Sequence, residues 1–403
     1  MSSIRLGEIG KISMCKRILK SQTNEFSGIP FYKISTFGGT PTVYIDEKIY
    51  REYKEKYSYP KKGDILISAA GTIGKTVIFD GEDSYFQDSN IVWIENDESK
   101  VTNQFLYYFL QTNPFITTNG STIKRLYNDN LRDTKIPNVP SIQQQNQITD
   151  VLGTLDKKIQ INNQINQELE AMARTLYDYW FVQFDFPDRN GKPYKSSGGK
   201  MVYNPELKRE IPEGWGVEKL DSLLKIGKET TNPMKSPNEE FKYYSIPEFD
   251  TTGTYSLQLG ESIKSNKFKV EKNDLLVSKL NPWFNRVIYN LEENAISSTE
   301  FIVWKTFNRF EKNFLYQVAT GKEFIEYCTR FATGTSNSHK RVSPDIMIGF
   351  QIPFEKAYIQ KFGKIIDSIR TQVLQNNEQN QELTQLRDWL LPMLMNGQVK
   401  VER

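Results

Sequence analysis

The sequence predicts an α+β fold with two strand-rich domains, joined by two long helices that form an intramolecular antiparallel coiled coil. Three features of the 403 residues predict it: a long internal repeat, two heptad-like segments, and runs of β-branched and aromatic residues between turn residues. A chain of this length holds more than one core. We therefore expect a pseudo-two-fold repeat of one domain and one helix.

The repeat is clearest in two pairs of segments. The stretch "KKGDILIS" at residues 61–68 corresponds to "EKNDLLVS" at residues 271–278, a shift of 271 − 61 = 210 residues. The triplet "IVW" recurs at residues 91–93 and 302–304. A pattern repeated at nearly the same spacing, here 210 and 302 − 91 = 211 residues, indicates two copies of a structural unit. Each half of the chain is therefore expected to contain the same kind of domain.

One turn in the first half resembles a phosphate-binding loop. The stretch "AAGTIGKT" (residues 69–76) follows the strand-like run "DILIS" (residues 64–68). A phosphate loop needs a helix directly after it, because the N-terminus of that helix faces the anion. The residues that follow, "VIFD" (77–80), are typical of a strand. We predict a strand-turn-strand hairpin in place of a nucleotide site.

The second half supports the hairpin, because the same turn there reads "KLNPWFNR" (residues 279–286) and has no glycine. A position that accepts both sequences is expected to be a variable surface loop. Its "NPWF" (residues 281–284) resembles the Asn-Pro-Pro-aromatic loop of amino-group DNA methyltransferases but lacks the second proline. The chain also lacks a glycine-rich segment suited to S-adenosylmethionine. We predict no catalytic residues and no cofactor.

Residue counts exclude several other kinds of site. The single histidine, His339, cannot build a multi-histidine zinc site, and its polar segment lacks the Gly-x-Ser-x-Gly turn of a hydrolase. Cys15 and Cys328 are too far apart in sequence to predict a disulfide framework or a clustered cysteine metal site. The net charge of +3 neither requires nor excludes nucleic acid, which binds local patches. No signal sequence or membrane span is expected, which favours the cytoplasm.

Two segments carry apolar residues at alternating spacings of four and three, the seam of a coiled coil. An ordinary core-facing helix is the alternative interpretation. The first segment, residues 141–181, would make a helix of about 60 Å, which a compact domain does not bury alone. The predicted seam positions are Ile148, Leu152, Leu155, Ile159, Asn162, Asn166, Leu169, Ala173, Leu176 and Trp180 in the first segment, and Phe362, Ile366, Ile369, Val373, Asn376, Asn380, Leu383, Arg387, Leu390 and Leu394 in the second.

Both seams contain asparagine pairs at equivalent places, Asn162 with Asn166 and Asn376 with Asn380, related by 376 − 162 = 214 residues. An Asn in an apolar seam lowers stability but fixes the register, because its amide must find another amide. We therefore expect the first helix to pair with the second.

These patterns divide the chain into five segments. Residues 1–140 form the first strand-rich domain, 141–184 the first helix, 185–210 a polar linker, 211–350 the second strand-rich domain and 351–403 the second helix.

Basic and amide side chains on the predicted turns are candidates for binding nucleic acid. Lys and Arg neutralise phosphates, and Arg, Lys, Asn and Gln also contact base edges. A solvated surface role is the alternative for each residue taken singly. The segments "GSTIKRL" (120–126) and "GTSNSHKRV" (334–342) occupy equivalent places, which favours a role for these loops as groups. The candidates are Lys33, Thr72, Lys75, Lys124 and Arg125 in the first domain, and Lys279, Asn281, Arg286, Asn337, Lys340 and Arg341 in the second.

Five stretches together form a specific signature: "GDILIS" to "GTIGK" (63–75), the entry to the first helix "IPNVPSIQQQNQITDVLGTLDKKIQINN" (136–163), "LYDYWFVQFDFP" (176–187), "GGKMVYNPELKREIPEGW" (198–215) and "LRDWLLPMLMNGQV" (386–399). On these residues the chain resembles the specificity subunits of type I restriction-modification systems across essentially its whole length. The second domain departs from the Gly-Thr-Ile-Gly-Lys pattern at its equivalent turn, so the two turns are not expected to make equivalent contacts.

The resemblance implies a non-catalytic subunit in which each strand-rich domain is a target recognition domain for one half of a split double-stranded DNA site. The helices would set the gap between the halves. Two methyltransferase subunits would dock on the protein and bring S-adenosylmethionine and adenine-N6 methylation, and two motor and nuclease subunits would add ATP-driven translocation and cleavage. From the residues alone, two similar but non-identical domains favour an asymmetric bipartite site.

Two alternatives stay open. A structural adaptor whose two domains bind proteins predicts no sequence-selective DNA binding. A phosphate-loop nucleotidase predicts ATP turnover that is lost in Lys75→Ala.

Overall fold

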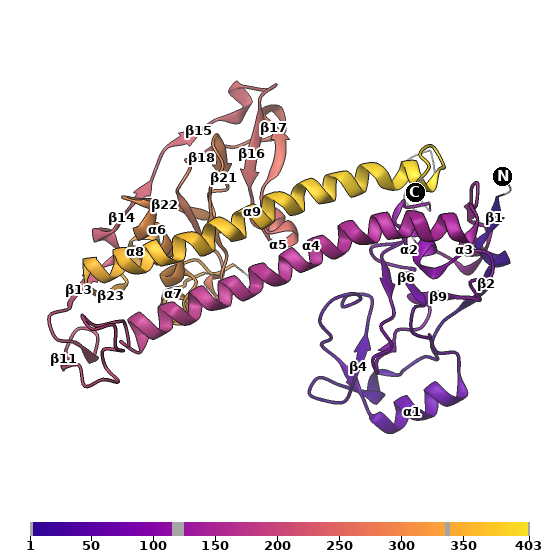
Figure 1. Cartoon of the computed structure of the whole chain (residues 1–403), viewed down its shortest axis with the longest axis horizontal. Coiled ribbons are helices and arrows are strands. Elements are labelled where there is room, and N and C mark those ends of the chain that lie inside the picture. The colour runs from indigo at the N-terminus through magenta and orange to yellow at the C-terminus, as the bar shows by residue number, and fades with distance from the viewer. Residues whose placement is uncertain (1–2, 115–124, 335–338, 402–403) are drawn as a thin grey trace. The chain divides into compact units, whose positions relative to one another are not determined.

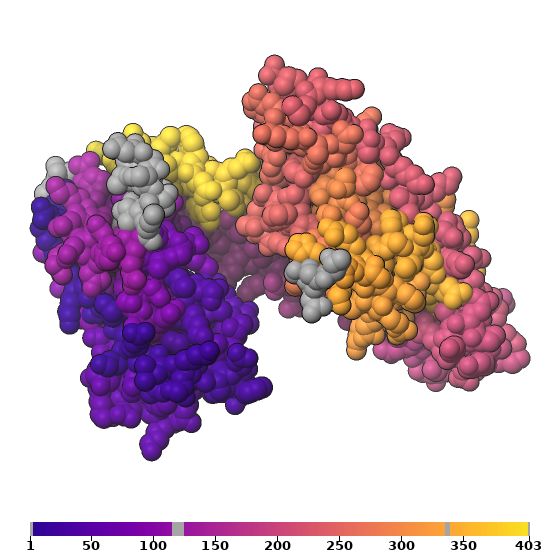
Figure 2. Space-filling view, turned by 180° about the vertical axis from the view of Figure 1, so that it is seen from behind, coloured from indigo at the N-terminus to yellow at the C-terminus, as the bar shows by residue number. Residues whose placement is uncertain are grey.

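The computed structural model describes residues 3–114, 125–334 and 339–401 (Figure 1). The chain divides into two compact units. Unit 1 comprises Met1–Asn162 and Glu378–Arg403, and unit 2 comprises Asn163–Asn377. The surface of each unit can be followed by colour in Figure 2, where the strand-rich part of unit 1 is indigo to purple and that of unit 2 is rose to orange.

The strand-rich part of unit 1, here called head 1, lies within residues 3–140. Its described strands form two four-stranded sheets, ordered β2-β9-β6-β7 and β3-β5-β4-β8, and β1 pairs with β10. The strands are β1 Ile4–Arg5, β2 Gly10–Ser13, β3 Thr23–Asn24, β4 Ile29–Tyr32, β5 Tyr44–Ile45, β6 Ile65–Ser68, β7 Thr76–Ile78, β8 Tyr85–Phe86, β9 Ile91–Asn96 and β10 Lys135–Ile136. The helices are α1 Glu47–Lys56, α2 Asn103–Gln111 and α3 Asn128–Asp133.

The strand-rich part of unit 2, here called head 2, lies within residues 211–354. Over its described residues, one sheet has the order β14-β22-β19-β20, a second has the order β15-β18-β21-β16-β17, and β13 pairs with β23. The strands are β13 Gly216–Lys219, β14 Leu224–Gly227, β15 Thr230–Thr231, β16 Glu240–Tyr244, β17 Ser256–Leu259, β18 Lys267–Val270, β19 Leu275–Ser278, β20 Val287–Tyr289, β21 Ala295–Ser297, β22 Phe301–Thr306 and β23 Gln351–Phe354. The helices are α5 Ile246–Thr252, α6 Arg309–Ala319, α7 Lys322–Phe331 and α8 Pro344–Ile348.

The two heads share the topology that the internal repeat predicts. The order β2-β9-β6-β7 in head 1 matches β14-β22-β19-β20 in head 2, and each second sheet contains one parallel pair, β4 with β8 and β16 with β21. Each central strand, β6 or β19, is buried along its whole length, because β-branched and leucine side chains fill both faces. The predicted repeat is confirmed.

The same aspartate turn precedes both central strands. The Asp64 carboxylate accepts from the Lys61 amide at 2.7 Å, and the Asp274 carboxylate accepts from the Glu271 amide at 2.8 Å. Burial raises the pKa of both carboxyl groups, partly offset by these backbone hydrogen bonds. A buried acid at both turns is therefore a fixed part of the repeat.

The segment that resembles a phosphate loop forms the predicted hairpin. Strands β6 and β7 pair antiparallel, with Leu66 opposite Val77. A strand follows the turn where a nucleotide site would need a helix. The hairpin prediction is confirmed.

Each half ends in a long helix, as predicted. The first, α4 (Ile142–Tyr177), continues into a π-helical turn at Asp178–Val182, and the second is α9 (Lys356–Met395). Within each unit a part of α4 lies beside a part of α9 (Figure 1). In unit 1, Asp156 contacts Arg387 and Asn162 contacts Asn380, so the two helices run antiparallel.

The segment predicted as a polar linker, residues 185–210, is more structured than its composition indicates. Strands β11 (Met201–Asn204) and β12 (Arg209–Pro212) form a hairpin. Beside them the ring of Phe186 stacks on Trp215 at 4.9 Å. A few aromatic residues provide this packing. The segment was predicted to be a linker because its overall composition is rich in Gly, Ser and Lys.

Within the part of the chain that the structure describes, no helix combines the length and the apolar run that crossing a lipid bilayer requires.

Candidate nucleic-acid interface

The hairpin turn of head 1 is closed by contacts around Ser68. The Ser68 hydroxyl donates to the Thr72 carbonyl and accepts from the Lys75 amide at 2.9 Å. The Gly74 amide donates to the Ser68 carbonyl at 3.0 Å. Gly71 and Gly74 have φ of 66° and 82°, which favours glycine at both positions. The turn is therefore a compact loop that leaves the Thr72 side chain exposed.

Lys75 connects this turn to the loop that follows β4. Its ammonium donates to the Phe37 carbonyl at 2.6 Å. The same loop begins at Lys33, whose amide donates to the Thr36 hydroxyl at 3.1 Å. Over the described residues, neither the Lys33 nor the Lys75 ammonium meets a carboxylate. Two uncompensated positive charges therefore lie on adjoining loops.

Arg125 lies at the same edge of the sheet. One guanidinium nitrogen, Nη2, donates to the Ser89 carbonyl at 3.0 Å. The neighbouring Asn90 carbonyl accepts from the Ala69 amide, and the Ala69 carbonyl accepts from the Leu126 amide, both at 2.8 Å. The structure thus brings together Lys33, Thr72, Lys75 and Arg125, while Lys124 falls outside the described residues, as does Asn337 of head 2.

In head 2 the equivalent turn pairs with the chain that precedes α8. The Val342 amide donates to the Lys279 carbonyl at 3.1 Å, and the Asn281 amide donates to the Lys340 carbonyl at 2.7 Å. The Asn281 side-chain oxygen accepts from the Lys340 amide at 3.0 Å. Residue Asn281 is buried, so its amide group holds the two segments together. This pairing brings Lys279 and Lys340 to one place.

Arg286 is held by a carboxylate. Its Nε and Nη2 donate to the two oxygens of Asp250 at 2.6 Å and 2.7 Å, and the guanidinium lies 4.6 Å from the ring centroid of Phe284. Only 10% of the Arg286 side chain is exposed. A bidentate pair of this kind orients the guanidinium strongly. The DNA contact predicted for Arg286 stays a prediction, and the structure gives this side chain a second role within the loop.

Arg341 makes a similar pair. Its Nε and Nη2 donate to the Glu300 carboxylate at 2.9 Å and 3.0 Å, and this hydrogen bonding raises the pKa of the Arg341 guanidinium. In contrast, over the described residues the ammonium groups of Lys279 and Lys340 have no hydrogen bond or ion pair. The uncompensated cations of this face of head 2 are therefore lysines.

Both heads thus present cationic loops at the same hairpin turn of the same sheet. Comparisons with known proteins show what the chain is similar to. Residues 1–171 match the family described as type I restriction modification DNA specificity domain. A putative type I restriction enzyme specificity subunit of Haemophilus influenzae is 53% identical over 180 residues, 44% of this chain and 46% of that protein. The MjaIX type I restriction enzyme specificity subunit of Methanocaldococcus jannaschii is 26% identical over 362 residues, 85% of this chain and 78% of that protein. The chain is thus similar to type I specificity subunits, in its first 171 residues to their family model and over 85% of its length to the MjaIX subunit.

The fold agrees with that of a solved specificity subunit. The crystal structure of the type I restriction-modification S subunit from M. genitalium superposes with a TM-score of 0.56 at 15% identity, and the match covers 98% of this chain and 95% of that one. The specificity-subunit fold, with strand-rich heads and two long helices, is therefore the fold of this chain.

The asparagines of the helix seams contact one another between α4 and α9 within each unit. In unit 1 the Asn162 amide donates to Asn380 at 2.9 Å and to Gln379 at 2.8 Å. In unit 2 the Asn376 amide donates to the Asn166 side-chain oxygen at 2.8 Å. The predicted contacts between amides are present, and their role in fixing the register stays a prediction.

Sequence reasoning missed the acidic partners of the two arginines in head 2. Asp250 and Glu300 lie 36 and 41 residues from the arginines that they hold. No local spacing links an acid to a base over such a separation. The contacts follow from the fold of head 2, which places Asp250 of α5 and Glu300, the residue before β22, beside the turn.

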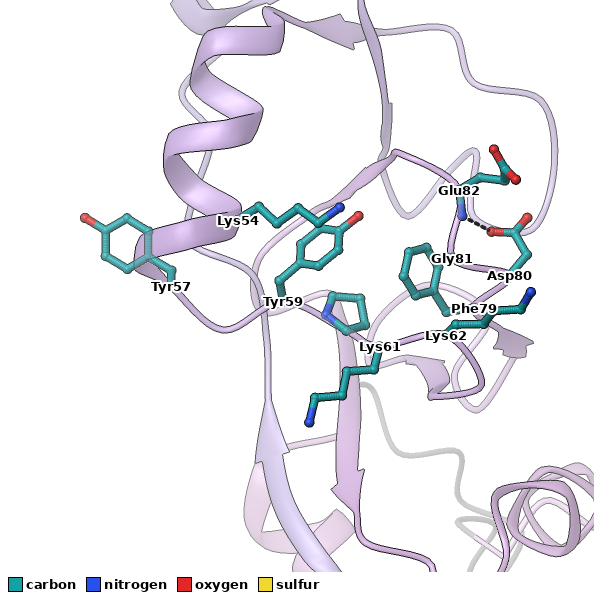
Figure 3. Close-up of a pocket in the computed structure, with 10 residues that line it drawn as sticks. Lys54, Tyr57, Tyr59, Lys61, Lys62, Phe79, Asp80, Gly81 and Glu82 are labelled. Carbon is teal, nitrogen blue, oxygen red and sulfur yellow. Dashed lines mark hydrogen bonds between the residues drawn. The ribbon is translucent and has the colours of Figure 1, made fainter.

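Head 1 also contains a pocket that the sequence did not predict (Figure 3). Its volume is about 640 Å³, and it lies at the end of β6 opposite the hairpin turn. Lys54 lies over the Tyr59 ring at 4.9 Å, and the Glu82 amide donates to Asp80 at 2.9 Å. The lining is Lys54, Tyr57, Tyr59, Pro60, Lys61, Lys62, Phe79, Asp80, Gly81 and Glu82. Its lining has three lysines and two carboxylates, and it lies at the other end of β6 from the hairpin turn, so it does not extend the cationic face of head 1.

Among the residues that the structure describes, no three or more His, Cys, Asp or Glu side chains are grouped as a metal site would require.

Proposed function

We propose that this chain is the DNA sequence-specificity subunit of a type I restriction-modification complex. Each head reads one half of an asymmetric bipartite site in double-stranded DNA. The helix pair sets the spacing of the two halves and docks two adenine-N6 methyltransferase subunits. Two motor and nuclease subunits complete the restricting form of the complex.

The observation that carries the proposal is the pair of cationic turns at equivalent places in two related heads. Lys75 and Arg125 bond only to backbone carbonyls in the described part of head 1, so their charges stay available for phosphates. Lys279 and Lys340 supply the corresponding charges in head 2. Two different heads of one topology fit two different half-sites.

The ion pairs refine the set of proposed DNA contacts. We assign direct contacts to the lysines and to Arg125, because their positive charges have no carboxylate partner among the described residues. Arg286 and Arg341 shape the loops of head 2 through Asp250 and Glu300. An arginine whose two guanidinium nitrogens donate to one carboxylate must give up two charge-assisted hydrogen bonds before it contacts DNA.

The partners supply the chemistry in this proposal. The methyltransferase subunits bring S-adenosylmethionine and flip the target adenine out of the duplex, while this chain holds the duplex in place. Exposed apolar side chains on the helix pair, including Met172 and Trp389, provide surface for docking such subunits.

The test is to co-express the chain with its neighbouring methyltransferase gene and to map N6-methyladenine in the host DNA by single-molecule sequencing. We expect methylation on two short specific blocks separated by a gap of fixed length. A stable complex that methylates no defined sequence would overturn the proposal and favour the protein-binding adaptor.

A further inference from the structure

Two neighbouring aromatic side chains project from the turn of head 2 that corresponds to the hairpin turn of head 1. Trp283 and Phe284 belong to a 3-10 turn, Pro282–Phe284, between β19 and β20. Their exposed fractions are 38% and 58%, and their ring centroids are 6.0 Å apart. Aromatic side chains of this size usually bury most of their surface, whereas Phe284 exposes more than half of its surface and Trp283 more than a third. A pair of them at the tip of one loop therefore needs a reason.

The loop is held in one shape from both ends. Asn281 and Asn285 have φ of 47° and 48°, a left-handed conformation that is uncommon outside glycine but tolerated by asparagine. The Phe284 amide donates to the Asn281 carbonyl at 3.0 Å, and the Asn285 side chain donates to the Thr320 carbonyl at 3.5 Å. Residues in this conformation persist only where their surroundings fix them, and they concentrate at binding sites.

Arg286 fixes the outward position of Phe284. Its guanidinium lies 4.6 Å from the Phe284 ring centroid while it is itself held by Asp250. The ring therefore has a cation on one face and Trp283 beside it, and 58% of the Phe284 side chain is exposed. The ion pair with Asp250 keeps the Arg286 guanidinium from contacting DNA and holds it against the Phe284 ring, which stays at the surface.

The charges around the loop point to a nucleic-acid occupant. Lys279 directly precedes the loop, and the backbone of Lys340 pairs with Asn281 at 2.7 Å and 3.0 Å. Over the described residues the two ammonium groups have no partner. Aromatic rings beside free lysines match the face of a base and the phosphates that flank it.

The equivalent turn of head 1 has a different tip. There Thr72, Ile73 and Gly74 stand where head 2 has Pro282, Trp283 and Phe284. The two heads therefore share the cationic turn but not the aromatic tip, so the aromatic contact belongs to one half-site only.

We propose that Trp283 and Phe284 are specificity-determining residues that stack on bases exposed at a local opening of the duplex within the half-site read by head 2. The proposal rests on the proposed function, because it assumes that head 2 reads DNA. It adds the kind of contact, which is stacking against a partly unstacked base step, and the two side chains that make it.

The experiment uses the full chain in complex with its methyltransferase and duplexes that carry the mapped bipartite site. Each nucleotide of both half-sites is replaced in turn by an abasic nucleotide, and affinities are measured for the wild type, Trp283→Ala, Trp283→Tyr and Phe284→Ala. The matched control is Phe307→Ala, because Phe307 has a similar exposure of 57% but follows β22 at the other end of the same sheet.

We expect Trp283→Ala and Phe284→Ala to weaken binding roughly 5- to 100-fold, as removal of a base-stacking aromatic does. Trp283→Tyr and Phe307→Ala are expected to bind within about two-fold of the wild type, since a tyrosine ring still stacks. At one or two positions of the second half-site, the abasic nucleotide should weaken the wild type but not Trp283→Ala. Because no phosphate contact is lost, the salt dependence of binding should be the same for all variants.

The stacking proposal would be overturned if both alanine variants bound with wild-type affinity and showed the same abasic profile as the wild type. The proposed function would still hold in that case, provided that the wild type binds its site selectively. Equal losses at both half-sites would also overturn the stacking proposal. If the wild-type complex binds no sequence selectively, the proposed function and this inference fail together.

Discussion

A hydrogen atom in place of a methyl group at Gly363 lets head 2 pack closely on α9. A Cβ at this position would lie 2.2 Å from the Phe310 carbonyl oxygen, and the Asn313 side chain donates to the Gly363 carbonyl at 2.9 Å. We expect Gly363→Ala to destabilise unit 2 by about 1–3 kcal/mol, because the α6 backbone must move. Thermal unfolding followed by circular dichroism would measure the change.

Gly153 of α4 provides the matched control. A Cβ there would meet the Tyr108 hydroxyl at 3.7 Å, an ordinary contact distance. Gly153→Ala is expected to keep or raise the stability by up to about 1 kcal/mol, since alanine favours the helix. Equal losses in the two variants would show that close packing at Gly363 is not the cause.

Lys312 makes the stability of unit 2 depend on pH. Its side chain is fully buried, its ammonium donates to the Asn290 carbonyl at 2.7 Å, and it lies 3.7 Å from the Tyr289 ring centroid. Burial lowers its pKa to about 7, partly opposed by the charge of Asp274. Above that pH the unfolded chain binds a proton that the folded chain lacks, so stability rises with pH until the unfolded pKa near 10.5 is passed.

We therefore expect the wild type to gain more stability than Lys312→Met between about pH 7.5 and about pH 9.5, by up to roughly 1.4 kcal/mol per pH unit. Urea unfolding at each pH would give the comparison. Lys305→Met is the control, because the pKa of Lys305 is raised by Glu271 and Asp274 despite the opposing effect of partial burial. Parallel pH profiles for the wild type and Lys312→Met would contradict the expectation.

At the residue scale, the sequence predicted where the cations lie but not which of them are compensated. Lys75 and Lys340 were found from turn chemistry and from the repeat, which are local signals. The partner of Arg286 is 36 residues away on α5, and that contact depends on how β16 lies in the sheet. A single sequence holds no direct record of such a contact.

At the element scale, the helix pair contains a carboxylate-arginine pair in each unit. In unit 1 Asp156 of α4 accepts from Arg387 of α9, and in unit 2 Glu170 of α4 accepts from Arg370 of α9. The acid belongs to α4 and the arginine to α9 in both cases. Pairing α4 with α9 satisfies both arginines, whereas pairing either helix with its own kind would place like charges together.

The two arginines differ in burial, which predicts different costs of removal. The Arg370 side chain is 5% exposed and lies 3.9 Å from the Tyr316 ring centroid, whereas the Arg387 side chain is 25% exposed. We expect Arg370→Ala to destabilise by about 2–3 kcal/mol, because a buried guanidinium loses its packing on Tyr316 and its hydrogen bonds to Glu170, whose own side chain is 36% exposed. Arg387→Ala should cost about 1 kcal/mol. Chemical denaturation of both variants would test this order, and a larger loss in Arg387→Ala would refute it.

The asparagines of the seam are expected to specify pairing more than stability. In Asn162→Leu with Asn376→Leu, apolar contacts replace the amide hydrogen bonds that reach Asn380 and Asn166. We expect the double variant to keep or raise its thermal midpoint but to form additional oligomers or registers, visible by size-exclusion chromatography with light scattering. A monodisperse variant that unfolds sharply at a lower temperature would contradict this.

The elements themselves were largely readable from the sequence. The four-three spacing predicted α4 and α9, because a seam repeats over many turns and tolerates polar interruptions. The hairpin β11 and β12 was missed, because four-residue strands in a polar stretch leave a weak pattern. Long periodic helices can be predicted from their own sequence, whereas short strands form because of the residues they pack against.

At the scale of the whole molecule, the proposed function predicts that each head recognises its own half-site independently of the other. Lys75→Ala should weaken recognition of the first half-site only, and Lys340→Ala recognition of the second half-site only. If both lysines contact phosphates, each variant should also flatten the slope of log K against log salt by about 0.9. Affinities for duplexes with one half-site scrambled, measured at several salt concentrations, would test both statements.

Lys56→Ala is the control for these variants, because Lys56 is exposed on α1 and pairs only with Glu52 of the same helix among the described residues. Its affinity and salt slope should equal those of the wild type. A loss at both half-sites in Lys75→Ala would show that the heads do not read independently.

The sequence predicted the doubling of the molecule but not the boundary between its compact units. That boundary falls inside both helices, at Asn162 and Asn377, so that residues 378–403 join unit 1. The alternating spacing of four and three residues continues through both positions, so the sequence pattern does not mark the boundary. The division follows from which head each half-helix touches, and only the folded chain contains that information.

The composition of unit 1 has a consequence for biosynthesis. Leu391, Leu394 and Met395 of α9 complete the core of head 1 beside Ile148 and Leu152. A ribosome makes head 1 before head 2, yet these side chains emerge only after all of unit 2 has been synthesised. The head that is made first is therefore the one that finishes folding last, and a chain that stops near residue 377 would carry a complete unit 2 and an open core in unit 1.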